Sequence, residues 1–374
     1  MSVIPKTVDF FLGANSENGF VSHFSQLQDP KSEQKLYLLK GGPGTGKSSL
    51  MKRLAAQLEQ QANEVYTERI HCSSDPDSLD GVMFQNGRCV VLDATRPHPL
   101  EPIYAGAMET MVNLLEHVDD AKLEESRQEI VEVSGAISSY HKKFCELLRC
   151  ANTLLDANRR LILPYVDMEK IRRTAQRIAK REFRIGKNHI PGKEQVRLLS
   201  AFTPKGLITY ESTVTTLCRN RYFISDEHRV CAPVLLQFLR QELKEREIGY
   251  YLCYSPFRPG DEIDHILIPE LDLAFLTVNK YEPMSSITPT RSIHAVRFLN
   301  QEILRAKKQR LSFYRKTAAE VLQEGIFTLE KAKEAHDALE CFYLPCVDFS
   351  GIDQLSEMLL NKIKRRYALP AGEQ

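Results

Sequence analysis

The sequence has almost no net charge, because 50 lysines and arginines are balanced by 49 aspartates and glutamates. A chain without a charge excess has no overall field that would draw it toward nucleic acid or an anionic membrane surface. It also has no run of 18 apolar residues, and residues 1–15 contain one lysine and no apolar segment of the kind found in signal peptides. We therefore expect a cytoplasmic protein that does not engage a membrane.

Cysteine pairs that would bind a metal are also missing. The nine cysteines form no CxxC pair and no Cys/His set with zinc-ligand spacing, so we interpret them as reduced thiols that pack as small apolar side chains. The rest of the composition is that of a globular protein, with 26% charged and 43% hydrophobic residues among 374. At roughly 150 residues per domain, this length predicts two or three domains and excludes a disordered chain.

An internal repeat organises the chain. Four segments of the first half are matched, in the same order, by segments of the second half. The matched pairs are 11–24 with 198–211, 78–84 with 262–268, 89–95 with 273–279, and 163–167 with 344–348. The repeat predicts two tandem domains, residues 1–190 and 191–374, with Pro191 and Gly192 at the boundary.

Each copy begins with short apolar runs that alternate with helical patterns, which is typical of βαβ units on a parallel sheet. The remainder of each copy is helical, over about 121–187 and about 293–368. A heptad seam that needs a partner helix runs through Ile130, Val133, Ile137, Tyr140, Phe144, Leu147, Ala151 and Leu154. Because Met168, Ile171, Ala175 and Ile178 keep this spacing after Pro164, we predict an α/β fold of two parallel-sheet domains, each followed by a long helical hairpin.

The segment KLYLLKGGPGTGKSS contains the pattern of a phosphate-binding loop, Gly, four residues, then Gly-Lys-Ser. An apolar strand over 36–39 precedes it, and Leu50, Leu54 and Leu58 line one face of the predicted helix that follows. Glycines let backbone N–H groups close around a phosphate, and a helix N-terminus adds partial positive charge. We expect Lys47 to neutralise the β and γ phosphates. The predicted nucleotide contacts are Gly41, Gly42, Pro43, Gly44, Thr45, Gly46, Lys47, Ser48 and Ser49.

A Mg²⁺ site is predicted at Ser48 and Asp93. The Ser48 hydroxyl would bind the ion, and Asp93 ends the apolar run CVVLD in the manner of a Walker B acid. The next residue is Ala94, where strongly hydrolytic P-loop proteins often carry Glu, so the group that activates water is missing or lies elsewhere. The predicted catalytic residues are accordingly Lys47 and Asp93.

Two polar loops add candidates. The segment ERIHCSSDPDSLDG follows a predicted strand and offers His71 and Asp75 as further catalytic residues, with Asp77 and Asp80 as other polar groups. The alternative is turn chemistry, which Asp-Pro and Ser-Asp pairs also serve. A proline-rich loop after Asp93 contributes Arg96, His98 and Glu101, and it is either a positioned loop or a passive connection.

The motif GGPGTGKSS, the HCSSDPDSLDG loop, the LDATRPHP segment and the tandem arrangement together resemble a family of bacterial tandem P-loop ATP-binding proteins whose function is largely uncharacterised. The resemblance covers essentially the whole chain. It implies a P-loop NTPase fold in each half, with ATP and Mg²⁺ bound through residues 41–48 and Asp93. It implies no particular substrate.

The second copy has lost the phosphate-binding residues. Aligning Leu50 with Leu235 places the segment SDEHRVCAPVLL over the glycine-rich loop. The replacements are Arg229 for Gly44, Cys231 for Gly46, Ala232 for Lys47, Pro233 for Ser48 and Thr277 for Asp93. We therefore expect a degenerate second loop that binds no nucleotide, and one nucleotide per chain.

Three functions remain open: a slow ATPase or ATP-driven switch, a kinase for a small molecule or nucleotide, and an ATP-sensing interaction protein that does not hydrolyse ATP. The segment NKYE (279–282) resembles a guanine-reading element, but it lies in the second copy, so ATP is favoured over GTP. Protein partners are expected at the helical arms. Residues 170–187 contain eight basic residues and one acidic residue, which fits either nucleic-acid binding or a solvated helix face.

Overall fold

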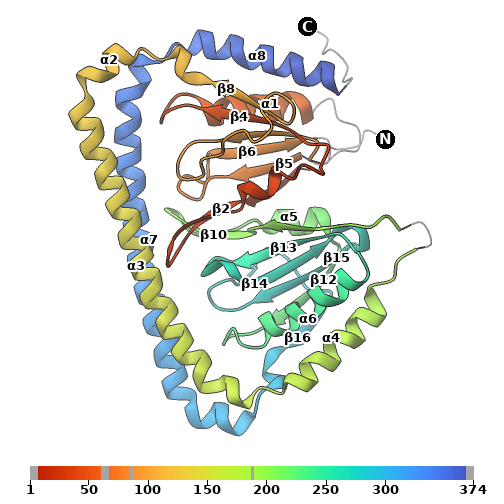
Figure 1. Cartoon of the computed structure of the whole chain (residues 1–374). Helices are drawn as coiled ribbons and strands as arrows, with labels where there is room; N and C mark the ends of the chain where they lie inside the picture. Colours follow the sequence, from red (N-terminus) through yellow and green to blue (C-terminus); the bar gives the residue numbers. More distant parts are fainter. Residues whose placement is uncertain (1–6, 60–66, 85–86, 187–188, 368–374) are drawn as a thin grey trace. The chain divides into compact units, whose positions relative to one another are not determined.

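A computed structural model describes residues 7–59, 67–84, 87–186 and 189–367. The chain forms two compact units, and each unit takes segments from both halves of the sequence (Figure 1). Unit 1 comprises Met1–Gly13, Ser22–His141 and Leu329–Gln374, and unit 2 comprises Ala14–Val21 and Lys142–Thr328. These units differ from the predicted division into 1–190 and 191–374, because parts of each copy pack in the unit of the other.

Each unit contains a six-stranded, mostly parallel sheet, so the predicted α/β class is correct. The strand order is β1-β5-β6-β7-β4-β8 in unit 1 and β9-β13-β14-β15-β12-β16 in unit 2. In both sheets the third strand is antiparallel to its two neighbours, and the other pairings are parallel. Equivalent strands thus occupy equivalent places, which supports the internal repeat.

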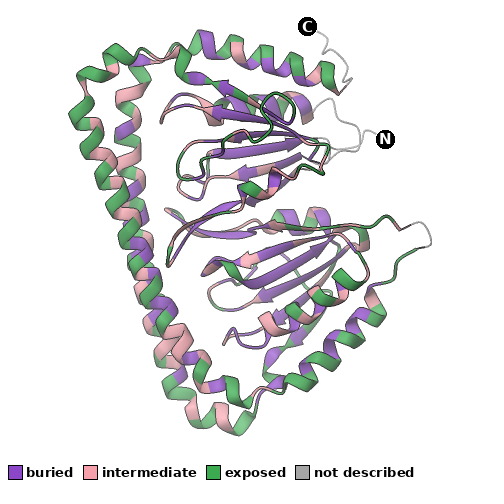
Figure 2. Ribbon diagram, viewed as in Figure 1, coloured by how far each residue is buried: buried purple, intermediate pink, exposed green. Residues whose placement is uncertain are grey.

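The strands of both sheets are largely buried (Figure 2). The first sheet consists of β1 (Thr7–Phe11), β4 (Lys35–Lys40), β5 (Thr67–His71), β6 (Leu79–Phe84), β7 (Cys89–Asp93) and β8 (Glu109–Asn113). The second consists of β9 (Glu194–Arg197), β12 (Asn220–Ser225), β13 (Tyr250–Ser255), β14 (Arg258–Ile268), β15 (Leu273–Val278) and β16 (Arg291–His294). Two-stranded ribbons are formed by β2 (Gly13–Ser16) with β3 (Gly19–Ser22), and by β10 (Ser200–Thr203) with β11 (Gly206–Thr209).

Two helices from different copies bury their apolar faces in unit 1. They are α1 (Lys47–Glu59), which follows the glycine-rich segment, and α8 (Phe349–Arg366), near the end of the second copy. Leu50, Leu54 and Leu58, which were predicted to line one face of α1, are at most 2% exposed. They share a core with β4, β7 and the α8 residues Ile352, Leu359, Leu360 and Ile363. The second copy therefore completes the core around the first copy's sheet.

The reciprocal exchange occurs in unit 2, where α4 (Met168–Glu182) packs with α6 (Ala232–Glu245). Ile171, Ala175 and Ile178 of α4 are buried in the core that contains β12, β14 and β15. The predicted helical hairpin is therefore wrong. An apolar stripe on a helix fits any apolar surface, and here it covers the sheet of the other copy instead of its own preceding helix.

The long helices α3 (Arg127–Ile162) and α7 (Gln301–Tyr343) lie side by side and are each other's partners (Figure 1). In unit 2 the Phe144 ring lies 3.2 Å from the point where a Cβ on Gly325 would stand. Phe144 and Ala151 of the predicted seam are fully buried. The heptad seam was thus correctly predicted in α3, but its partner is α7.

The repeated sequence Leu-Pro-x-Val-Asp forms the turn after each long helix. Its first residues form the 3-10 helices η3 (Leu163–Tyr165) and η6 (Leu344–Cys346). Asp167 and Asp348 accept hydrogen bonds from backbone N–H groups in the first turns of α4 and α8, and so cap these helices. The valines form isolated bridges, Val166 with Leu299 and Val347 with Val118. These bridges attach α4 within unit 2 and α8 within unit 1.

The remaining elements are short. They are α2 (Asp120–Glu125), α5 (Glu211–Leu217), and the 3-10 helices η1 (Phe24–Leu27), η2 (Leu114–His117), η4 (Pro269–Leu271) and η5 (Ala295–Phe298).

Candidate functional site

The glycine loop, residues 41–48, connects the end of β4 to the start of α1, as the sequence predicted. Gly44 and Gly46 have φ angles of 66° and 81°, in the left-handed region that side chains rarely adopt. Thr45 steadies the turn, because its hydroxyl donates a hydrogen bond of 2.8 Å to the carbonyl of Gly42. The loop therefore brings its backbone to the N-terminus of α1, where backbone N–H groups and the helix dipole favour an anion.

Lys47 and Asp93 lie beside each other at this loop. The Lys47 ammonium donates hydrogen bonds to the carbonyls of Gly41 (2.9 Å) and Gly42 (2.7 Å), and it lies 3.6 Å from Asp93 Oδ2. Both side chains are 13% exposed. Asp93 reaches this place because β7 is the parallel neighbour of β4, with Leu39 opposite Asp93.

Residues at the start of β6 connect Ser48 to the loop that carries Asp75. The Ser48 hydroxyl accepts a hydrogen bond of 3.0 Å from the backbone N–H of Leu79. The neighbouring Ser78 donates its hydroxyl to Asp75 Oδ2 at 2.9 Å. The predicted candidate Asp75 therefore belongs to a loop that touches the glycine loop. Hydroxyl and carboxylate oxygens, as offered by Ser48 and Asp93, suit a hard cation such as Mg²⁺.

His71 lies away from Lys47 in these contacts. Its Nε2 is 2.8 Å from Asp9 Oδ1 on β1, and its Nδ1 is 2.9 Å from the carbonyl of Pro76. Both ring nitrogens thus engage groups outside the glycine loop. They tie the end of β5 to the adjacent strand and to the Asp75 loop.

Asp80 and His98, which the sequence places in two separate loops, form a pair that was not predicted from the sequence. His98 Nε2 lies 3.3 Å from Asp80 Oδ2, both residues are buried, and the imidazole stacks on Phe24 with ring centroids 4.5 Å apart. Burial lowers the pKa of His98, but the hydrogen bond and charge of Asp80, with the charge of Asp93, outweigh it, so the pKa is raised. This pair anchors the proline-rich loop, which is therefore held in place by contacts.

No sequence pattern predicted that the end of α7 contacts the glycine loop. A Cβ on Gly42 would stand 2.6 Å from the Tyr343 ring, and one on Gly44 would stand 3.4 Å from the carbonyl oxygen of Glu340. Lys333, two turns before Glu340 on α7, lies 3.6 Å from Asp75 Oδ2. These residues are about 290 positions from the loop in sequence, and only the repeat offset, once the helix exchange was known, would have brought them together.

The second copy retains the shape of the loop in part, and there an aspartate side chain accepts the backbone N–H groups at the helix start. Asp226 takes the place of Gly41, and its Oδ2 accepts backbone hydrogen bonds from Val230 (2.9 Å), Cys231 (2.7 Å) and Ala232 (2.8 Å). Arg229 has a φ of 54°, in the same left-handed region as Gly44. Three N–H groups at the start of α6 are therefore satisfied by an internal carboxylate, at the position where the first copy would cradle a phosphate.

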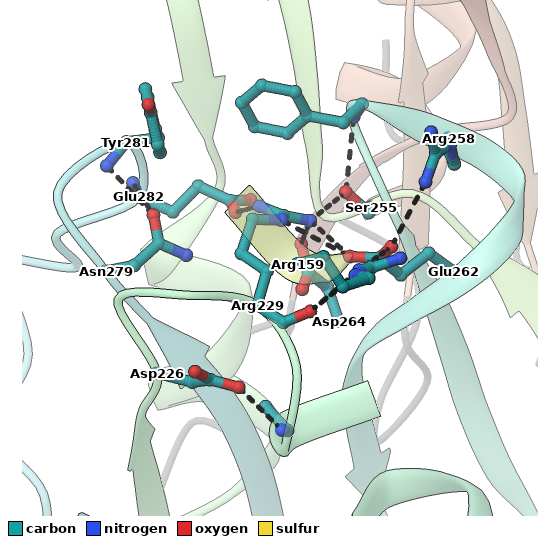
Figure 3. Close-up of polar contacts among 12 residues, drawn as sticks. Arg159, Asp226, Arg229, Ser255, Arg258, Glu262, Asp264, Asn279, Tyr281 and Glu282 are labelled. Carbon is teal, nitrogen blue, oxygen red and sulfur yellow. Dashed lines mark hydrogen bonds and ion pairs between the residues drawn. The ribbon is translucent and has the colours of Figure 1, made fainter. Parts of the chain in front are cut away.

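The Arg229 side chain fills the space next to this loop (Figure 3). Arg229 is 4% exposed, and its guanidinium lies 2.9 Å from Glu262, 2.9 Å from Glu282 and 3.3 Å from Asp264. Arg159 of α3 donates two hydrogen bonds to the carbonyl of Arg229 and one to Glu262. Burial and the charge of Asp264 raise the pKa of Glu282 well above its ordinary value, which favours its protonated form.

The same cluster explains the NKYE segment and argues against a metal there. Asn279 accepts backbone hydrogen bonds from Tyr281 and Glu282, a turn that aims Glu282 at Arg229. Asp264, His265 and Glu282 come close enough to share an ion, but two of them already bind Arg229. His265 Nδ1 accepts the backbone N–H of Thr277, which leaves the proton on Nε2, and burial lowers its pKa to about 4. A protonated Nε2 cannot ligate a metal.

The basic segment forms the exposed face of α4, opposite the face buried in unit 2. Glu169 pairs with Arg172 and Arg173, and Arg181 pairs with Glu182. An open cavity of about 750 Å³ is lined by Asp167, Glu169, Lys170, Arg173, Gln176, Arg177 and Lys180. Lys187 lies outside the described residues. The carboxylates reduce the charge that this face presents, and nucleic-acid binding here stays a prediction, as do protein partners at the arms.

Comparisons of the chain with protein-family models, curated proteins and solved structures found no match. Within the described ranges, no helix is both long enough and apolar enough to cross a membrane.

Proposed function

We propose that the chain binds ATP with Mg²⁺ at the glycine loop of the first copy and acts as a slow ATPase or ATP-driven switch. The proposal rests on three side chains that are found at the glycine loop, a lysine, a serine and an aspartate. Lys47, the first residue of α1, lies between the loop carbonyls and Asp93, and Ser48 is the next residue of the same helix. A cation, a hydroxyl, a carboxylate and a helix N-terminus at one loop are the groups that triphosphate binding requires.

Each group has a role in this proposal. Lys47 exchanges its bonds to the loop carbonyls for bonds to phosphate oxygens, and the glycine loop supplies backbone N–H groups. Ser48 and Asp93 would hold Mg²⁺, which neutralises charge on the transferred phosphoryl group. Ala94, which is fully buried after Asp93, offers no acid to activate water. We therefore expect slow ATP hydrolysis, which fits a slow ATPase or an ATP-driven switch and does not fit a rapidly hydrolysing enzyme.

The proposal includes one nucleotide per chain. Its support is the second copy, where Asp226 occupies the anion position and Arg229 the adjacent space. A phosphate at that loop would have to displace a carboxylate that three backbone N–H groups hold. Calorimetric titration of the wild-type chain with ATP and Mg²⁺ should give a stoichiometry near one, and two equivalent sites would contradict this part.

The central test is Lys47→Ala, with Lys52→Ala as the control. Lys52 is exposed on the same helix, so its removal alters charge without touching the loop. Lys47→Ala should lower ATP affinity at least about a hundredfold, because each charge-assisted hydrogen bond to phosphate contributes about 1.5–3 kcal/mol. Lys52→Ala should leave the affinity within a factor of about three. Equal affinities for the two variants would refute ATP binding at this loop.

Phosphate release separates the remaining candidates. A slow ATPase releases inorganic phosphate from ATP and Mg²⁺ without an added acceptor, and Lys47→Ala stops the release. A kinase would need an acceptor, and a sensor would bind ATP without release. Release that persists in Lys47→Ala would point to a contaminating enzyme and count against the proposal.

A further inference from the structure

The end of α7 runs along the edge of unit 1 at which the strands of its sheet finish. Asp75, which Lys333 approaches, follows β5, and Gly42 and Gly44, which Tyr343 and Glu340 contact, follow β4. Beyond η6, the backbone N–H of Asp348 donates to the carbonyl of His117, which lies after β8. In α/β sheets, ligands bind at the carboxyl ends of the parallel strands. A nucleotide at the glycine loop must therefore lie next to α7.

Gly42 and Tyr343 fit each other closely. Gly42 does not have the positive φ of Gly44 or Gly46, so its backbone would tolerate a side chain. The contact with Tyr343 leaves no room for a side chain, because a Cβ on Gly42 would stand 2.6 Å and 3.0 Å from two carbons of the Tyr343 ring. A side chain at this position would therefore force the Tyr343 ring or the loop to shift. The close fit couples the loop to the docked position of α7.

The other unit repeats this arrangement. There Arg159 of α3 bonds to the carbonyl of Arg229, the residue equivalent to Gly44. The repeat offset that aligns Leu163 with Leu344 also aligns Arg159 with Glu340 and Asn152 with Lys333. The end of a long helix from the other copy therefore contacts the loop in both units, so this contact is a feature of the fold.

We infer that α7 forms the outer wall of the ATP site and that Lys333 provides positive charge to the bound phosphates; this rests on the proposed function. Lys333 belongs to the helix face that also carries Asp337 and Glu340, and its ammonium now pairs with Asp337 and lies 3.6 Å from Asp75. Asp75 is linked through Ser78 and Leu79 to Ser48. From its place beside the Asp75 loop, the Lys333 side chain would reach a phosphate by exchanging its carboxylate partners for phosphate oxygens. ATP binding then depends on residues of both copies.

The first test compares Lys333→Ala with the control Lys331→Ala. Lys331 is on the same helix and pairs with Glu334 at 2.8 Å, three residues along. Lys333→Ala should weaken ATP binding at least about tenfold, as expected for one charge-assisted bond, while Lys331→Ala and Lys333→Arg should change it less than about threefold. The affinity for ADP should fall less than that for ATP if Lys333 meets the terminal phosphate. Thermal unfolding by circular dichroism checks that each variant is folded.

The second test uses the fit between Gly42 and Tyr343. Gly42→Ala should weaken ATP binding at least about tenfold because its methyl group pushes the Tyr343 ring and α7 away. Adding Tyr343→Ala removes the obstructing ring, so the double variant should bind ATP within about threefold of Tyr343→Ala alone. A double variant no better than Gly42→Ala would mean that the methyl group acts on the loop only, and would overturn the role of α7.

The outcomes separate this inference from the proposed function. If Lys47→Ala abolishes ATP binding but Lys333→Ala behaves like Lys331→Ala, the site exists and α7 does not take part. If the wild-type chain binds no ATP, the proposed function itself fails.

Discussion

Replacing Asp226 with alanine should destabilise unit 2 strongly, because this buried carboxylate accepts the backbone N–H groups at the start of α6. Asp226 is 1% exposed, and its Oδ2 receives three backbone hydrogen bonds of 2.7–2.9 Å from the start of α6. The Oδ1 atom accepts a fourth, of 3.2 Å, from the N–H of His228. In Asp226→Ala these donors lose their acceptor inside the protein.

The magnitude follows from those bonds. Loss of an N-cap costs about 0.5–2 kcal/mol, and each buried donor left without an acceptor adds about 1–3 kcal/mol. These terms are not additive, since water enters and the loop relaxes, so we expect a total loss near 3–5 kcal/mol. Asp226→Asn keeps one oxygen for the N–H groups of α6, but it removes the charge and replaces the oxygen that accepts from His228 with an NH2 group, so its loss should be smaller than that of Asp226→Ala, about 1–2 kcal/mol.

Urea unfolding followed by hydrogen–deuterium exchange of peptides from α6 would measure this loss in unit 2 itself. Asp261→Ala is the control, because Asp261 is an exposed carboxylate of the same unit. Formate should restore part of the stability of Asp226→Ala, since it returns a carboxylate to the free N–H groups, and it should not stabilise the wild type. A loss below about 1 kcal/mol, or one equal to that of Asp261→Ala, would refute the view that Asp226 fills the cradle.

Two further predictions concern the buried polar pairs. Arg229→Met should lower the free energy of urea unfolding of unit 2 by about 3–5 kcal/mol, because it leaves buried carboxylates without their positive partner. Adding Asp264→Asn should recover part of this loss, and no recovery would contradict the assigned pairing. His98, whose pKa is raised from 6.5, should stabilise unit 1 fully below about pH 6.5 and lose this contribution as the pH rises through its folded pKa. Urea unfolding between about pH 5.5 and 8.5 should therefore show the wild-type advantage over His98→Gln shrinking with rising pH, and a constant difference would count against it.

The sequence was sufficient for the parts of the site that are local. The glycine loop follows its strand and precedes its helix without interruption, so a motif and two apolar patterns describe it completely. Asp93 could be placed because strands that end in the same direction meet at one edge of a sheet. Both inferences need only nearby residues and the general geometry of parallel strands.

Partner choice among helices could not be predicted from spacing alone. The heptad positions of α3 show that a helix must cover them, and α4 and α7 both offer apolar stripes of suitable period. In the structure, Val166 at the turn after α3 bridges Leu299, and α4 packs on the sheet of the second copy. A single backbone bridge of this kind leaves no periodic signal in the sequence.

The contacts that replace the lost residues in the second copy could not be predicted from the sequence either. The segment DEHRVCAP shows the loss of glycine, lysine and serine, but Asp226 and Arg229 have meaning only when the loop is seen to keep its shape around them. Asp226 accepts the backbone N–H groups at the start of α6, and Arg229 balances acids that stand where the first copy has Asp80 and His98. A substitution that fills a site resembles, in sequence, a substitution that destroys one.

These observations together give a reason for the second copy to be retained. Its own loop is filled by Asp226, yet α8 supplies four buried side chains to the core of unit 1, and Tyr343 rests against Gly42. The first copy in turn supplies α4 to unit 2. Because η6 joins α7 to α8, the residues of the second copy that contact the glycine loop and those that complete the core of unit 1 lie next to each other in the sequence. The second copy thus contributes α8 and the end of α7 to unit 1, although its own loop holds no nucleotide in the function proposed above.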